Sequence, residues 1–297
     1  YMKTLNKIIL YLQSLPPKRI YLYLLIPLSV SLLILVYMML YPYVSAGRDW
    51  GIWFRPAIIL LFSGKTPYTL AIANPPWALL ILAPLALLPP KAGSIIIVML
   101  SPILFGLIAN RLGAKLLPTI FFALSSPVIH NAVNHTIDWL PALGFLMPPQ
   151  IGLFFVLIKP QVGIGVAIYW LFEAWQKNRV KGVIRVFWPV TVAYLVSFVL
   201  FGNWLLSGTN ASMQLAQRHG EADLFPWAVP LGLAILFYAL RKKLQTLSIS
   251  ASPLLSPYVA MHSWSSFLLG LVNYPALSIT ACILSWVITF WGWSLRP

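Results

Sequence analysis

Five acidic residues in a chain of 297 make a short list of groups that could accept a proton. Three of them have ordinary explanations as charges at a membrane interface or in a solvated loop: Glu173, Glu221 and Asp223. Asp138 differs because it lies where an apolar run begins, and an acid near membrane depth indicates a functional group. The alternative for Asp138 is a buried pair with His135 or Lys159.

Asp49 is the strongest candidate for chemistry. It lies between Arg48 and Trp50, in a stretch that could press it against a membrane surface. A carboxylate there could act as a general base on a substrate hydroxyl while neighbouring cations hold an anionic group. The alternative is an interfacial ion pair of Asp49 with Arg48 or Arg55, and position alone favours that ion pair.

The four histidines suggest a metal site only weakly; they are His130, His135, His219 and His262. His130 and His135 near Asp138 could supply ligands, but a spacing of five residues does not put both imidazoles on one helical face. The sequence also lacks a Walker loop, a dinucleotide fingerprint and a Gly-x-Ser-x-Gly elbow. We therefore predict no metal and no other cofactor.

The composition predicts an all-α membrane protein that holds these side chains in place. Sixty per cent of the residues are apolar and 8% are charged, against about 25% charged in an ordinary soluble domain. At one span per ~20 apolar residues, the chain has room for about ten membrane segments. We expect residues 1–297 to form a single integral membrane domain.

The basic residues indicate which face is cytoplasmic. They gather at the ends of apolar runs: Lys3, Lys7, Lys18, Arg19, Lys177, Arg179, Lys181, Arg185, Arg241, Lys242 and Lys243. This pattern follows the positive-inside rule and argues against nucleic acid as a partner. We expect residues 1–19 to be a cytoplasmic lead-in and residues 42–76 to be the first extracytoplasmic loop, with an interfacial helix over residues 50–62.

Broken segments are expected in the middle of the chain. The pieces 140–147 and 151–158 would each rise only ~12 Å as helices, which is too short for a core of ~30 Å. We expect them to be broken half-spans buried against protein. The remaining apolar runs are 20–41, 77–88, 93–109, 116–129, 162–175, 186–206, 227–240, 254–272 and 276–295, with a basic loop at 177–185.

Several motifs resemble glycosyltransferase family 87, whose members are membrane enzymes of the GT-C superfamily and include bacterial mannosyltransferases. The resemblance rests on Asp-Trp-Gly-Ile-Trp at 49–53, Gly-Lys-Thr-Pro-Tyr at 64–68, Asn-Pro-Pro at 74–76, Ala-Pro-Leu-Ala-Leu-Leu-Pro at 83–89, Leu-Ile-Lys-Pro-Gln at 157–161, Ser-Pro at 256–257 and His-Ser-Trp at 262–264. It is most specific in the first loop. The chain is short for this family, and residues 134–138 stand where the family commonly has a Gly-Gln pair.

The resemblance implies a GT-C bundle that transfers a sugar from a polyprenyl-phosphate donor to a lipid or glycan acceptor. The reaction would occur on the outer face of a prokaryotic plasma membrane, with membrane lipids around the chain and a divalent metal optional. Asp49 would be the catalytic base. Cations for the donor phosphate would be Lys159, Arg48, Arg55 and Arg218, and further substrate contacts would come from His262, His135, Asp138 and Tyr68.

Two other functions remain open on the residues alone. Broken helices and buried basic groups also suit a transporter or flippase for an anionic lipid or sugar phosphate. Internal symmetry would favour that class, and the two halves show no convincing repeat. A non-catalytic membrane subunit is the third possibility, with the 13 Trp and 16 Phe residues serving as packing and interfacial anchors.

Overall fold

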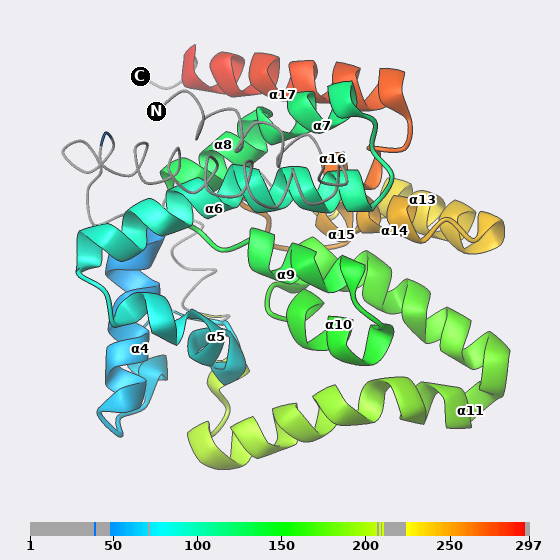
Figure 1. The fold of residues 1–297 in the computed structure, drawn as a ribbon. Coiled ribbons are helices and arrows are strands. Elements are labelled where there is room, and N and C mark those ends of the chain that lie inside the picture. Colours follow the sequence, from blue (N-terminus) through cyan, green and yellow to red (C-terminus); the bar gives the residue numbers. More distant parts are fainter. Residues whose placement is uncertain are drawn as a thin grey trace, which may run out of the picture. The chain divides into compact units, whose positions relative to one another are not determined.

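The computed structural model describes residues 39, 48–70, 72–206, 208, 210 and 224–294. The chain divides into two compact units, Tyr1–Ser45 and Ala46–Pro297, and all described residues except Met39 belong to the second. Within the described ranges every regular element is a helix, and no strand occurs (Figure 1). The all-α class predicted from the sequence is confirmed. The lead-in at 1–19 and the run at 20–41 lie outside the description, apart from Met39.

The first helices follow Asp49 directly. A π-helical turn, η2 (Trp50–Phe54), continues into α4 (Arg55–Phe62), so the helix expected over residues 50–62 is present. Its location at a membrane surface stays a prediction. Then come η3 (Pro67–Thr69), α5 (Pro76–Ala86) and α6 (Pro90–Arg111). Proline begins α5 and α6, where its fixed φ suits the first helical position and no amide hydrogen is needed.

Short helices fill the middle of the chain. The pair α7 (Leu116–Ala123) and α8 (Ser126–Val133) bends by 46° at the break between them. The short pieces expected at 140–147 and 151–158 are present as helices, namely α9 (Trp139–Leu143) with η4 (Gly144–Leu146), and α10 (Pro149–Val156). That they are half-spans of a membrane stays a prediction. They pack so closely that a Cβ on Gly144 would lie 2.7 Å from the carbonyl oxygen of Gly152, so only glycine fits there without a shift.

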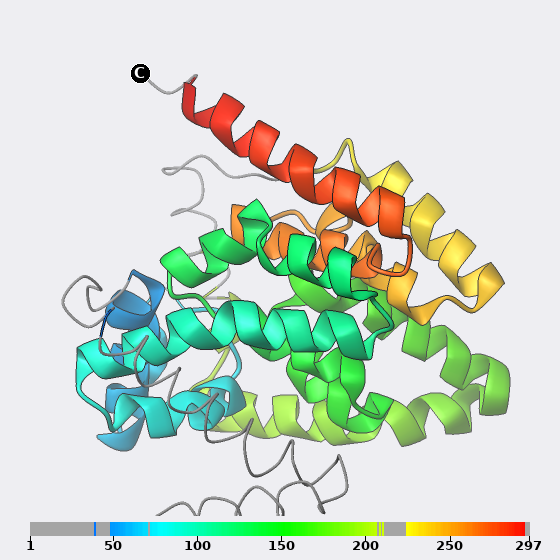
Figure 2. The same cartoon turned by 45° about the horizontal axis from the view of Figure 1, so that its top comes forward.

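The prediction of a basic loop at 177–185 is wrong. Helix α11 (Pro160–Phe201) runs through this segment and turns sharply at Asn178 and Arg179, whose φ angles are −141° and 51° (Figure 2). Two helical arms therefore meet at a tight corner rather than at a nine-residue loop. The cluster of charges at 177–185 is typical of a loop, yet Lys and Arg are good helix formers that continue a helix on its exposed side.

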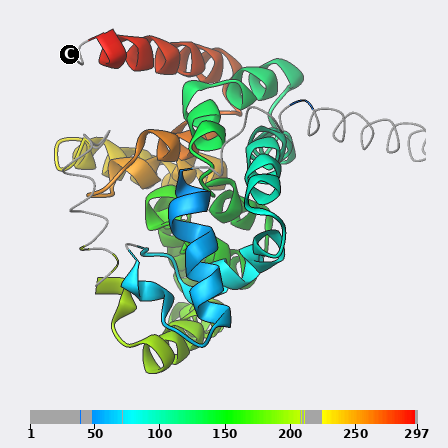
Figure 3. The same cartoon turned by 90° about the vertical axis from the view of Figure 1, so that its left-hand side faces the viewer.

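The C-terminal part contains one further difference from expectation. It comprises α13 (Val229–Lys242), α14 (Gln245–Ile249), α15 (Ala251–Leu254), η5 (Met261–Trp264), α16 (Ser265–Gly270) and α17 (Pro275–Ser294). The predicted apolar run 254–272 is not one helix, because residues 255–260 are not helical and separate α15 from η5. Pro257 lies in this gap, where it cannot donate a helical hydrogen bond. Contacts with α7 hold α17 beside it (Figures 1 and 3).

Two helices in the described part are long and apolar enough to cross a membrane, α6 and α11, and the bent pair α7 and α8 would make a third. Large apolar side chains are exposed along α11, such as Trp188 at 56% and Val199 at 85%. Apolar surface of this extent is suited to lipid rather than water. The structure thus supports a membrane protein, while the expected number of about ten membrane segments is not confirmed.

The helices converge on one polar region. Helix α6 contacts α7, α8 and α9, helix α8 contacts η5, and helix α10 contacts the first arm of α11. The C-terminal end of α8, the start of α9, the junction between α10 and α11, and η5 therefore meet. These elements carry four of the candidate residues: His135, Asp138, Lys159 and His262.

Candidate functional site

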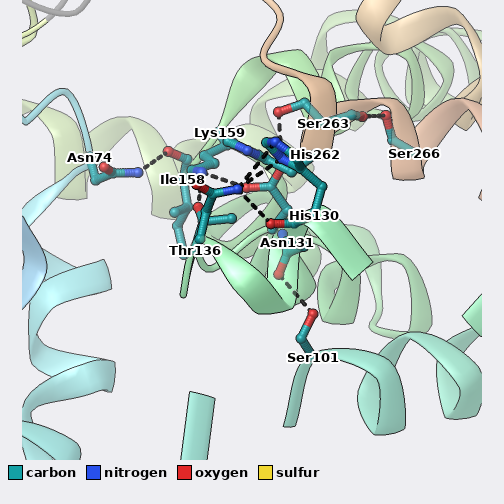
Figure 4. A network of polar contacts seen from close by, with 12 residues as sticks. Asn74, Ser101, His130, Asn131, Thr136, Ile158, Lys159, His262, Ser263 and Ser266 are labelled. Carbon is teal, nitrogen blue, oxygen red and sulfur yellow. Dashed lines mark hydrogen bonds and ion pairs between the residues drawn. The ribbon is translucent and has the colours of Figure 1, made fainter. Parts of the chain in front are cut away.

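A buried ion pair lies at the centre of this region. The carboxylate of Asp138, which is fully buried, accepts a hydrogen bond from Nζ of Lys159. Lys159 also donates to Oγ1 of Thr136 at 2.8 Å (Figure 4). Two of the three ammonium hydrogens therefore have partners, and one remains for another acceptor. Of the two alternatives left open by the sequence, Asp138 takes Lys159 and not His135.

The second carboxylate oxygen of Asp138 faces η5. Oγ of Ser263 donates to Asp138 Oδ2 at 2.8 Å, and Nε2 of His262 lies 3.8 Å from the same oxygen. The imidazole of His262 stacks on that of His130, with ring centroids 5.9 Å apart and planes at 19°. Nδ1 of His262 is buried and has no hydrogen-bond partner among the described residues. Asp138 therefore links Lys159 to a pair of imidazoles.

The electrostatics assign charges to this cluster. Burial opposes ionisation of Asp138, but the charge of Lys159 and the hydrogen bonds from Lys159 and Ser263 hold its pKa below the ordinary value. Burial lowers the pKa of His262, and Asp138 counteracts this only in part. We therefore take Asp138 as a carboxylate and His262 as a neutral imidazole near pH 7.

The end of α8 sets the direction of the segment that carries Asp138. His135 N donates to the carbonyl oxygen of Ala132 at 3.0 Å and Thr136 N donates to that of Asn131 at 3.1 Å, the pattern of a Schellman motif. His135 occupies the left-handed position with φ 55°, where glycine is usual. Its Nδ1 lies 2.7 Å from Oγ of Ser94 on α6. His135 thus ends a helix, and its contact with substrate stays a prediction.

The side chain of Asn131 supports the same turn. Its amide lies 2.8 Å from Oγ of Ser101 on α6. With the amide nitrogen facing Ser101 and the carbonyl oxygen of Thr136, the amide oxygen accepts from the backbone N–H of Asp138 at 3.2 Å. Asn131 is fully buried, so this bond is shielded from water and fixes the backbone of Asp138.

Asp49 lies beside the histidine cluster. Its backbone N–H donates to the carbonyl oxygen of Asn134 at 3.0 Å. Its carboxylate acts electrostatically on three imidazoles, those of His130, His135 and His262. The next residue, Trp50, is fully buried. Its indole packs against Gly93 so closely that a Cβ on Gly93 would lie 3.0 Å from it. Trp50 therefore anchors the start of the π-helical turn, a feature often found at functional sites.

The expected ion pair of Asp49 with Arg48 or Arg55 does not form. Among the described residues Asp49 takes part in no salt bridge, and its side chain is half-buried. Arg48 is exposed and acts electrostatically on His130, so it lies near the cluster. The Nε of Arg55 is buried without a partner in the described part.

Two further candidates are Tyr68 and Arg218. The hydroxyl of Tyr68 donates to the carbonyl oxygen of Asn74 at 3.1 Å, and its ring stacks on Trp204 with centroids 5.0 Å apart. Burial raises the pKa of the Tyr68 hydroxyl well above its ordinary value, so it remains protonated. Tyr68 therefore supports the chain around Asn74. Arg218 lies outside the described residues.

Some members of the cluster were not identified from the sequence. Thr136 and Ser263 bond the Asp138–Lys159 pair directly, and Asn131 holds the backbone of Asp138. A polar side chain inside an apolar run is the signal that could have found them, since buried polar groups need partners. The described part contains no group of three or more His, Cys, Asp or Glu residues suited to a metal.

The polar cluster is a buried site built from carboxylates, imidazoles and one lysine. It combines a carboxylate free of ion pairs within the described ranges, Asp49, with neutral imidazoles and a buried ion pair that carries no net charge. Comparison of the chain with family models, with curated proteins and with solved structures gives no match.

Proposed function

We propose that this chain is a membrane glycosyltransferase. It transfers a sugar from a polyprenyl-phosphate donor to a hydroxyl of a lipid or glycan on the extracytoplasmic face. The observation that carries the proposal is the state of Asp49. Its carboxylate pairs with no cation in the described part, while its backbone is fixed to Asn134 beside three imidazoles. Such a carboxylate is available to accept a proton.

The reaction balances with the groups present. The acceptor hydroxyl oxygen attacks the anomeric carbon, and the bond from that carbon to the donor phosphate oxygen breaks. The electron pair of the broken bond stays on the phosphate, and the hydroxyl proton moves to Asp49. The step needs neither a nucleotide nor an added acid, because the phosphate leaves as an anion.

Cations near the leaving phosphate stabilise its growing charge. Arg48 is the best placed in the described part, because it is exposed and lies near His130. Lys159 contributes less charge than the sequence suggested, since Asp138 neutralises it. Its third ammonium hydrogen can still donate to a phosphate oxygen. Arg55 and Arg218 remain proposed phosphate ligands on the resemblance alone.

The convergence of the family-like motifs supports the proposal. Asn74 of the Asn-Pro-Pro segment donates to the carbonyl oxygen of Ile158, one residue before Lys159. Lys159 pairs with Asp138, and Ser263, next to His262, donates to the same carboxylate. Segments that are distant in sequence and resemble glycosyltransferase family 87 thus meet at one cluster. This arrangement is what a shared site requires.

The function is tested with purified protein in lipid nanodiscs and a radiolabelled polyprenyl-phosphate mannose. Membrane lipid extract and short mannosides serve as acceptors, and the products are separated from the donor by chromatography. We expect labelled product together with free polyprenyl phosphate. Donor that stays intact, or that is consumed equally by protein with Asp49→Asn, contradicts the proposal. Movement of intact donor between leaflets without cleavage would indicate a flippase instead.

A further inference from the structure

The C-terminal end of α10 carries an unusual set of hydrogen bonds. The last carbonyl groups of any helix lack partners within the helix. Here Phe154 O accepts from Nε1 of Trp77 at 2.8 Å, and the two residues that follow the helix also bond to side chains. Leu157 O accepts from the hydroxyl of Tyr194 at 3.1 Å, and Ile158 O accepts from Nδ2 of Asn74 at 3.0 Å. We call these three donors the carbonyl caps.

The carbonyl caps come from different parts of the fold. Asn74 precedes α5, Trp77 lies in α5, and Tyr194 lies in the second arm of α11. The rings of Trp77 and Tyr194 also meet edge to face, with centroids 5.0 Å apart. The first-loop segment and the far arm of α11 are therefore tied to the same turn.

Burial makes the hydrogen bonds of the carbonyl caps costly to lose. Asn74 is 8% exposed, and Tyr194 packs between Trp77 and Trp204, with the Trp204 centroid 6.0 Å away. Water cannot easily replace a donor at such a place, so its loss leaves a buried carbonyl unpaired. The turn at 157–158 is therefore held in one conformation by groups from outside it.

Lys159 follows this turn directly. Its backbone is extended, with φ −137° and ψ 94°, before Pro160 begins α11. A shift of the two preceding carbonyls would move the Cα of Lys159 and with it the ammonium group. The hydrogen bonds to Thr136 and Asp138 depend on that position.

We propose that Asn74 and Tyr194 are positioning residues for Lys159. By bonding the carbonyls of Ile158 and Leu157, they keep the ammonium group of Lys159 on Asp138 and turn its remaining hydrogen toward the site. The effect on turnover rests on the glycosyl transfer proposed above. The effect on Lys159 itself is measured without any substrate.

The test uses two pairs of variants with matched controls. Asn74→Ala and Tyr194→Phe each remove one cap, and Tyr194→Phe removes a single oxygen atom. Asn110→Ala and Tyr238→Phe make the same chemical changes at exposed positions. Asp138→Asn weakens the ion pair directly, and its effect on Lys159 shows how strongly a released lysine responds.

The measurement is the rate at which formaldehyde and cyanoborohydride methylate each lysine of the full chain in detergent, followed by peptide mass spectrometry. Lys177, whose side chain is 69% exposed, is the internal reference. We expect Lys159 to react about tenfold faster in Asn74→Ala and Tyr194→Phe, the shift expected when one buried hydrogen bond is lost. Lys159 should react at the wild-type rate in Asn110→Ala and Tyr238→Phe.

Two outcomes overturn the proposal. One is an unchanged Lys159 rate in Tyr194→Phe, the variant least able to disturb folding. The other is an equal acceleration in Ile108→Val, which loosens the buried core of α6 without removing a cap. That result would mean that any loss of stability frees Lys159.

Turnover separates this proposal from the proposed function. If transfer occurs, loss of a cap should raise the KM for the lipid-phosphate donor and leave kcat nearly unchanged. A lower kcat at constant KM would indicate merely less folded enzyme and would count against positioning. If the wild-type protein transfers no sugar, the glycosyltransferase proposal fails, while faster methylation of Lys159 still supports the caps.

Discussion

Asp138 and Lys159 are 21 positions apart in the sequence and form a buried ion pair that no other acid in the described part shares. The pair has no net charge, yet it fixes the junction of α10 and α11 to the start of α9. Ser263 and Thr136 complete its hydrogen bonds. The cluster beside Asp49 is thereby rigid and nearly neutral.

The ion pair leads to a prediction about stability. Lys159→Met leaves a buried carboxylate without its cation, and we expect a loss of about 3–5 kcal/mol in the free energy of unfolding. The double variant Asp138→Leu with Lys159→Met should recover a large part of that loss, because no unpaired charge remains. Thermal unfolding in detergent measures both. A double variant as unstable as Lys159→Met alone would contradict the argument.

Asp49 leads to a prediction about catalysis. Asp49→Asn keeps the shape of the side chain and its backbone bond to Asn134 but removes the base. We expect transfer from a polyprenyl-phosphate sugar to fall by about 10²–10⁴-fold, with the melting temperature unchanged. Glu173→Gln is the matched control, since Glu173 forms an exposed pair with Lys177. Equal losses in both variants would remove Asp49 from the reaction.

The buried titratable groups predict a pH dependence of stability. The folded pKa of His262 lies below its ordinary value of 6.5, so below about pH 6.5 the unfolded chain binds a proton that the folded chain does not. Stability therefore falls as pH drops from about 7. Asp138, whose folded pKa also lies below its ordinary 3.8, adds a second loss as pH falls through that folded pKa.

We expect the wild-type melting temperature to be lower at pH 5 than at pH 7.5. His262→Gln should show a smaller difference, because it removes one of the groups that the unfolded chain protonates. Burial also lowers the pKa of His135, so His135 accounts for part of the pH dependence that remains in His262→Gln. Melting temperatures that rise toward acid pH would contradict this account.

Close helix packing predicts a contrast between two glycines. A Cβ on Gly165 in α11 would lie 2.1 Å from the carbonyl oxygen of Ser248, whereas a Cβ on Gly106 in α6 would meet nothing closer than 3.8 Å. Gly165→Ala should therefore push α11 from α14 and lower the melting temperature. Gly106→Ala should be neutral or stabilising by up to about 1 kcal/mol through helix propensity. The reverse order would contradict the packing.

Sidedness gives a further prediction. In a Cys282→Ser background, Lys65→Cys in the predicted first loop should react with an impermeant thiol reagent in intact cells. Lys181→Cys at the corner of α11 should react only after permeabilisation, because the basic corner is expected on the cytoplasmic face. Both lysines are exposed. Labelling of the two cysteines from the same side would refute the assigned orientation.

Local chemistry made much of the architecture predictable. Long apolar runs favour membrane helices, and the prolines at 76, 90, 149 and 160 begin helices as their fixed φ allows. The half-length pieces before Pro149 and Pro160 were also visible in the sequence. The corner at Asn178 was not, because only Asn178 and Arg179 leave the helical conformation and the chain is helical on both sides of them.

The sequence by itself determined that acids are scarce and that Asp138 needs a partner, with His135 and Lys159 as alternatives. Only the tertiary structure decided between them. His135 is nearer in sequence, but the Schellman turn after α8 directs its imidazole to Ser94 and leaves Asp138 facing the α10–α11 junction. A buried carboxylate pairs with the cation that packing brings within reach, and packing depends on contacts between segments far apart in the chain.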